Sequence, residues 1–154
     1  MEAQRFWYCD SCGEKIESAD RGYVEWIVTR NPLDVQKLNG RNLRIVHYDT
    51  KCYLDEKMEY AIDGGTLQSS ELRWFVGPNG LMKLLRIIAQ KNFSIEEGFE
   101  IIKRIHIPGY ETAHRHFEEA IAEGVFEPNV TEGYYPLEDI QVVNEWLEKR
   151  GSMA

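Results

Sequence analysis

Two short stretches decide the fold of the first third of this chain: Cys9-Asp-Ser-Cys12-Gly13 and His47-Tyr-Asp-Thr-Lys-Cys52. Two cysteines separated by two residues can reach one ion from a single tight turn, and Gly13 helps that turn to close because glycine adopts positive φ without steric cost. Three thiolates and one imidazole are the donor set of a closed tetrahedral zinc site. The spacing therefore predicts one structural zinc ion, bound by Cys9, Cys12, His47 and Cys52.

Other interpretations of these cysteines remain open. A Cys-x-x-Cys pair preceded by Trp7-Tyr8 is also typical of a thioredoxin-type redox site, but that motif belongs at a strand-to-helix junction of a βαβ unit, and no such unit surrounds Cys9. The thiols could instead be buried and unrelated to His47. A catalytic zinc ion would need a position open for water, and four protein ligands leave none. We favour structural zinc.

The sequence between the two cysteine stretches predicts a β-hairpin. Residues 23–28 and 43–48 are rich in β-branched and aromatic side chains, and turn signals at Asn31-Pro32 and Asn39-Gly40 lie between them. A helix is predicted over residues 53–62, before two glycines end it.

A cysteine turn, a hairpin and a second ligand pair near a helix start resemble the layout of a treble-clef zinc finger, over residues 6–62. The second pair is His-x4-Cys and differs from the commoner Cys-x2-Cys. Because an unfolded chain has no preformed site, we expect chelation to unfold residues 6–62 before the helical half.

Residues 63–80 are predicted to form a connector, because pairs of glycine and serine and a Gly-Pro-Asn-Gly turn interrupt any regular pattern. Within it, Trp74-Phe75-Val76 is expected to dock onto the core, since a free linker would not carry three large apolar residues.

From residue 81 onwards, apolar residues recur at helical spacing and predict four helices. Ser94 and Glu97 form a capping box at the start of the second helix, and residues 125–135 predict two short strands between the third helix and the last. The apolar stripes of the four helices are Leu81, Leu84, Leu85 and Ile88; Ile95, Phe99, Ile102 and Ile105; Ala113, Phe117, Ala120 and Ile121; and Ile140, Val143 and Leu147.

Helix, helix, short turn, helix, β-hairpin, helix is the order of a winged helix-turn-helix, and residues 81–126 resemble that family. The resemblance implies that the third helix enters the major groove with its N-terminal side chains at the base edges. Arg115 could then pair with guanine, and Thr112 could contact phosphate. The implied nucleic-acid-binding residues are Thr112, His114, Arg115 and His116.

The charge of the chain weighs against DNA. The net charge is −8, and the third helix also carries Glu118, Glu119 and Glu123, which repel phosphate. Winged helices also serve as protein-docking modules, so a protein partner or a solvated scaffold face is the favoured alternative.

Composition and motifs exclude several classes of protein. The 43% hydrophobic and 29% charged residues are ordinary for a globular protein, and no apolar run approaches the length of a membrane span. The N-terminus lacks the basic start and apolar core of a secretory signal, so we expect a cytoplasmic location. Phosphate-loop, dinucleotide-binding and nucleophile-elbow patterns are missing, no small-molecule substrate is evident, and an enzyme is the less favoured interpretation.

These observations together predict an α+β chain with a treble-clef-like zinc module at residues 1–62, a connector at 63–80 and a winged-helix-like domain at 81–154. The expected function is that of a regulatory or binding protein that contains zinc. Its partner is either DNA, as for a transcriptional regulator, or another protein, as for an interaction adaptor.

Overall fold

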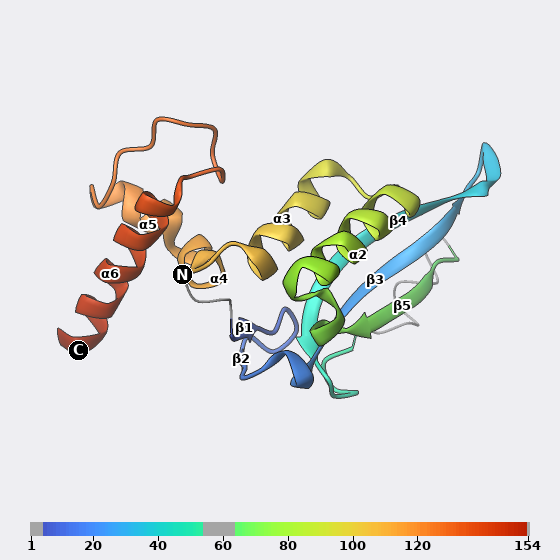
Figure 1. Ribbon diagram of the computed structural model, residues 1–154, viewed down its shortest axis with the longest axis horizontal. Helices are drawn as coiled ribbons and strands as arrows, with labels where there is room; N and C mark the ends of the chain where they lie inside the picture. Colours follow the sequence, from blue (N-terminus) through green and yellow to red (C-terminus); the bar gives the residue numbers. More distant parts are fainter. Residues whose placement is uncertain (1–4, 54–63, 154) are drawn as a thin grey trace. The chain divides into compact units, whose positions relative to one another are not determined.

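The structure is a computed structural model that describes residues 5–53 and 64–153. It confirms the α+β class, with small antiparallel sheets followed by a helical part (Figure 1). The chain divides into two compact units, one formed by Arg5–His106 and the other by Ile107–Ala154. This division falls after His106, whereas the sequence predicts a connector at residues 63–80.

The first unit contains two antiparallel sheets. Strands β1 (Trp7–Tyr8) and β2 (Lys15–Ile16) form the smaller one. Strands β3 (Gly22–Asn31), β4 (Asp34–His47) and β5 (Thr66–Glu71) form the larger one in the order β4-β3-β5.

Three predictions about the secondary structure of this unit have different outcomes. The strands predicted at residues 23–28 and 43–48 correspond to β3 and β4. Strand β5 lies in the predicted connector, where the structure shows regular pairing with β3. The helix predicted over residues 53–62 lies outside the described residues, apart from its first residue.

Helices α2 (Gly77–Gln90) and α3 (Ile95–His106) lie over one face of the larger sheet (Figure 1). The alternate residues Val24, Trp26 and Val28 of β3 share one core cluster with Leu84 and Ile101 of these helices. Residues of β1, β2 and the metal-ligand stretches belong to the same cluster, among them Trp7, Cys9, Ile16 and Cys52. One core therefore joins the cysteine turn, the sheet and both helices.

The segment before α2 joins this core only in part, through Phe75 and Val76. Helix η2 (Leu72–Phe75), a 3₁₀ helix, buries Phe75, while Trp74 is more than half exposed. His106, at the end of α3, donates a hydrogen bond from Nε2 to the Phe75 carbonyl oxygen over 2.8 Å. Burial lowers the pKa of His106 below its usual value, and the Phe75 hydrogen bond opposes that shift only in part.

Helix α3 is attached to the outer edge of β4. Ser94 caps the helix, accepting a hydrogen bond from the Glu97 N–H over 3.2 Å. A capping box would require the Glu97 carboxylate to accept from the N–H of the cap residue. Instead, its Oε1 accepts hydrogen bonds from the N–H groups of Asn42 and Leu43, over 2.7 and 3.3 Å. The N–H of Gly40 on the same strand donates to the Lys91 carbonyl oxygen.

The apolar stripes of α2 and α3 face the core only in part. Leu84 and Ile105 are buried as expected, but Leu85, Ile95 and Phe99 are 46%, 63% and 43% exposed. In α3 the reason is that Gly98, Ile101 and Arg104 are turned inward. A Cβ at Gly98 would lie 2.8 Å from Ile88 Cγ2, so the two helices meet at a contact that only glycine allows.

The second unit has its own core. Its helices are α4 (Tyr110–Ala113), the 3₁₀ helix η3 (His114–His116), α5 (Phe117–Ala122) and α6 (Leu137–Met153). The stripes predicted for the third and last helices are confirmed as core-facing. The core members of this unit are Tyr110, Ala113, Phe117, Ala120, Phe126, Tyr135, Ile140 and Val143.

The two short strands predicted at residues 125–135 are wrong, because the structure has no strand there. Phe126 and Tyr135 pack instead on Phe117, with the Phe117 and Tyr135 ring centroids 4.8 Å apart. Phe126 and Tyr135 are both buried in the core of this unit, and the segment between them forms no paired strands. The winged-helix resemblance therefore rests on the order of the helices alone.

No helix in the described part of the chain is both long and apolar enough to cross a membrane.

Candidate metal centre

The structure brings the four predicted ligand side chains together. The ligand atoms of Cys9, Cys12, His47 and Cys52 all lie within 4.8 Å of one another. Nδ1 of His47 is 3.4 Å from Cys12 Sγ and 3.8 Å from Cys52 Sγ. The edges of a tetrahedron with zinc-like bond lengths measure about 3.5–3.8 Å. The cluster could therefore hold a single metal ion.

The first two ligands lie in the tight turn between β1 and β2. The Gly13 N–H donates to the Cys9 carbonyl oxygen and the Cys9 N–H to the Glu14 carbonyl oxygen, both over 2.9 Å. Gly13 has φ +78°, a left-handed conformation that glycine adopts at little cost. The turn thus gives Gly13 the role expected from the sequence.

The other two ligands follow from the end of β4. His47 is the last residue of that strand, and the Cys52 N–H donates to the Asp49 carbonyl oxygen over 2.9 Å. The Asp49 side chain accepts from the Lys51 N–H over 3.0 Å, which closes an Asx turn. The Ser11 hydroxyl donates to the Cys52 carbonyl oxygen and so joins the two ligand turns.

The orientation of His47 matches that of a metal ligand. Its Nε2 lies 3.1 Å from the Lys15 carbonyl oxygen. A carbonyl oxygen only accepts hydrogen bonds, so Nε2 carries the proton and Nδ1 keeps a lone pair toward the sulfur atoms. Metal-bound histidines are typically oriented by a second hydrogen bond of this kind.

The thiols of the cluster differ in how readily they ionise. For Cys9, burial raises the pKa, but hydrogen bonds from the backbone at Cys12, His47 and Ser11 outweigh it and lower the pKa to about 7. For Cys52, burial and the neighbouring sulfur atoms of Cys9 and Cys12 raise the pKa to about 12. A divalent cation would remove this repulsion, and its binding would displace the remaining thiol protons.

A polar network that sequence reasoning missed supports the cysteine turn. Asp10, between the first two ligands, makes two 2.8 Å hydrogen bonds to the backbone of Ile45: its N–H donates to the Ile45 carbonyl oxygen, and its side-chain Oδ2 accepts from the Ile45 N–H. The same Oδ2 accepts from Arg104 Nη1 over 2.8 Å.

Arg104 has two further bonds to β1. Its Nη2 donates to the Tyr8 carbonyl oxygen, and its own carbonyl oxygen accepts from Trp7 Nε1, each over 3.2 Å. Its side chain is only 9% exposed. The available signal in the sequence was an arginine between Ile101 and Ile105 on the inner side of α3, because a buried charge requires partners.

The structure does not support the redox alternative. Cys9 and Cys12 lie in the turn of a two-stranded sheet and not at a strand-to-helix junction.

The four residues considered for nucleic-acid binding lie in the second unit, where the expected recognition helix is interrupted by η3. His114 is used internally: its Nε2 is 3.0 Å from Oε1 of the fully buried Glu111, and its ring stacks on Tyr110. Arg115 is exposed, and Thr112 and His116 are half-buried.

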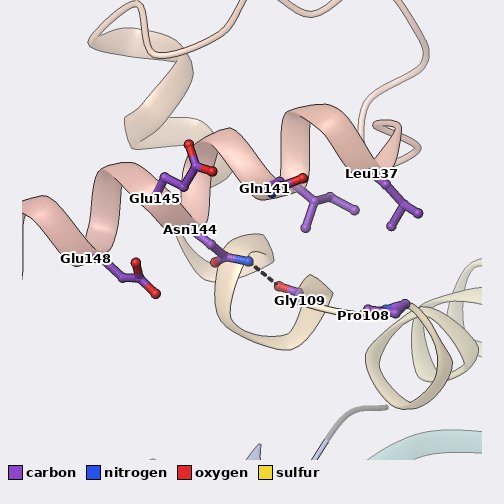
Figure 2. A pocket seen from close by; sticks show the side chains of 8 residues that line it. Pro108, Gly109, Leu137, Gln141, Asn144, Glu145 and Glu148 are labelled. Carbon is purple, nitrogen blue, oxygen red and sulfur yellow. Dashed lines mark hydrogen bonds between the residues drawn. The ribbon is translucent and has the colours of Figure 1, made fainter. Parts of the chain in front are cut away.

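The second unit has a hollow of about 410 Å³ between Gly109 and one face of α6, and Figure 2 shows the side chains that line it. Asn144 spans it and donates from Nδ2 to the Gly109 carbonyl oxygen over 3.0 Å. The other polar side chains at its rim are Gln141, Glu145 and Glu148. No nucleophile beside a base lies among the residues that line this hollow.

Comparisons of the chain with protein-family models, with curated proteins and with solved structures find no match. The fold and the site define an α+β protein with a cluster of three cysteines and one histidine that could hold a metal ion. Function is therefore inferred from the chemistry of the described residues.

Proposed function

We propose that this chain is a non-enzymatic binding protein whose first unit is stabilised by one zinc ion. The observation that carries the proposal is the cluster of four ligand atoms together with the Lys15 contact that orients His47. Thiolate and imidazole donors favour zinc over magnesium or calcium, which take oxygen ligands. A set of four also favours a structural ion, because it leaves no position for substrate or water.

The surroundings of the cluster support a structural role. Cys9 and Cys52 are 3% and 7% exposed and belong to the core cluster that contains Trp7 and Ile16. A zinc ion bound there would join the β1–β2 turn to the end of β4. The site would then stabilise the fold in the way that a disulfide stabilises a small secreted domain.

Purified protein is expected to contain one equivalent of zinc, and Cys9→Ser should lower the content well below one. Elemental analysis measures this, and cobalt substitution should give the visible absorption of a tetrahedral thiolate site. His116→Asn, which changes a histidine outside the cluster, is the matched control and should keep the full equivalent. Substoichiometric metal in the wild-type protein that Cys9→Ser does not reduce would contradict the proposal.

We further propose that the binding partner is a protein, with DNA as the alternative. The negative charge near Arg115 favours a protein partner over DNA. The exposed Glu118 and Glu119 follow Arg115 on α5, and their carboxylates repel phosphate. His114 is engaged with buried Glu111 and is poorly placed to reach a base edge.

In a gel-shift series against random duplex at low salt, the wild-type protein is expected to show no retention, and Arg115→Ala should behave identically. DNA binding would appear as retention that falls steeply with salt, because neutralised phosphates release counterions. If Arg115→Ala then lost about 1–3 kcal/mol of DNA-binding free energy and relaxed the base preference at one position, a DNA-binding regulator would become the better proposal than a protein-interaction adaptor.

A further inference from the structure

The outward side of α2 and α3 carries an apolar surface, here called the outer seam. Its exposed members are Met82 and Leu85 of α2 and Ile95 and Phe99 of α3, which are 68%, 46%, 63% and 43% exposed. Four large apolar side chains on two adjacent helices form more than a scatter of single exposed residues. We propose that the outer seam is where a second copy of this chain docks.

The two helices fix how the seam is arranged. They run back along each other after a short connection (Figure 1). Ile88 packs against Gly98, so these two residues lie at about the same level along the pair. In an antiparallel pair, a residue two positions before Ile88 on α2 lies at the same level as a residue two positions after Gly98 on α3. Arg86 is therefore level with Glu100.

The two sides of the seam carry opposite charge. Helix α2 contributes the exposed Arg86 and contains no acidic residue, while its Lys83 is directed to Ser70 and the Phe75 ring. Helix α3 has Glu96 and Glu100 on its outward side, and Lys103 offsets Glu100 in part through a 3.1 Å ion pair. The apolar surface thus lies between a basic helix and a mainly acidic one.

This distribution is complementary to itself. A two-fold axis parallel to the helices would place α2 of one copy over α3 of the other, so that the apolar residues meet at the centre. The same rotation preserves the level along the helices, which brings Arg86 of each copy opposite Glu100 of the other. The result is an antiparallel four-helix arrangement, with one charge pair on each side of an apolar centre.

Sedimentation velocity on the full chain tests the proposal. The wild-type protein is expected to form a dimer that dissociates on dilution through the micromolar range, and Phe99→Glu should be monomeric throughout. Arg86→Glu and Glu100→Arg should each weaken the dimer about tenfold or more, and the double variant should regain most of that loss. Lys37→Glu, a charge reversal on exposed β4, should leave the dimer unchanged.

All the substituted seam residues are on the helix surface, so circular dichroism and metal content should match those of the wild-type protein. A wild-type protein that stays monomeric at high micromolar concentration would overturn the proposal. So would a dimer that Phe99→Glu leaves intact, or charge reversals whose combination fails to restore association. The oligomeric state and the metal content are measured separately, so failure of this proposal can be told apart from failure of the zinc proposal.

Discussion

Removing the metal is expected to unfold the whole unit Arg5–His106 while Ile107–Ala154 keeps its structure. Structural zinc contributes about 10–16 kcal/mol of binding free energy in small zinc domains, which is as large as the total stability of most domains. The core cluster contains Cys9 and Cys52 together with Leu84 and Ile101 of the helices. Unfolding should therefore extend beyond residue 62, where the sequence alone placed its limit.

Hydrogen exchange read by mass spectrometry, with and without a zinc chelator, measures this effect by segment. Protection should be lost in β3, β4, α2 and α3 and retained in α6. Cys52→Ser should reproduce the chelated state, and His116→Asn should not. Full protection of β3 and β4 after complete removal of the metal would show that the ion is dispensable for folding.

The second large effect is expected from Arg104→Met, which should lower the free energy of unfolding by about 2–4 kcal/mol. Removing one partner of a buried ion pair typically costs about 3–5 kcal/mol, and the value is reduced here because Asp10 is one-third exposed. Methionine keeps most of the apolar stem of the arginine in place. Because Asp10 lies in the cysteine turn, zinc affinity should also fall by about 10–100-fold.

Urea unfolding gives the first quantity, and competition with a chromogenic chelator gives the second. Lys103→Met is the matched control on the same helix. Its ion pair with Glu100 is an i,i+3 contact within α3 and does not reach the cysteine turn, so its effect on zinc affinity should be small. Equal effects of the two substitutions would show that Arg104 has no special role in supporting the turn.

The ligand cluster was predictable because its signal is local. Two residues between Cys9 and Cys12, and four between His47 and Cys52, restrict each pair to one turn whatever the rest of the fold does. The strands β3 and β4 were predictable for a similar reason, since β-branched and aromatic residues dominate them. These predictions needed no knowledge of distant contacts.

Strand β5 was not predictable in this way. Its sequence, Thr66–Glu71, is mostly polar and contains the serine pair that suggested a connector. The strand forms because β3 offers it six paired positions, from Tyr23 with Glu71 to Val28 with Thr66. Tertiary pairing overrides weak local preference here.

The orientation of α3 was mistaken for a different physical reason. A search for large apolar residues selects Ile95 and Phe99, whereas the helix turns Gly98 and Arg104 toward the rest of the unit. Glycine gives no hydrophobic signal, yet it allows the close contact with Ile88. An arginine suggests a solvent-exposed position, yet the buried Arg104 guanidinium donates hydrogen bonds to Asp10 and Tyr8, which lie far away in the sequence.

The outer edge of β4 has a consequence for how this protein behaves at high concentration. A long edge strand with free N–H groups is a template on which strands from other molecules can add, and such growth leads to fibrils. Here the carboxylates of Glu97 and Asp10 and the carbonyl oxygen of Lys91 already occupy the N–H groups of Gly40, Asn42, Leu43 and Ile45. An incoming strand would have to displace a helix and the cysteine turn before it could pair, so this edge is protected against amyloid-like polymerisation.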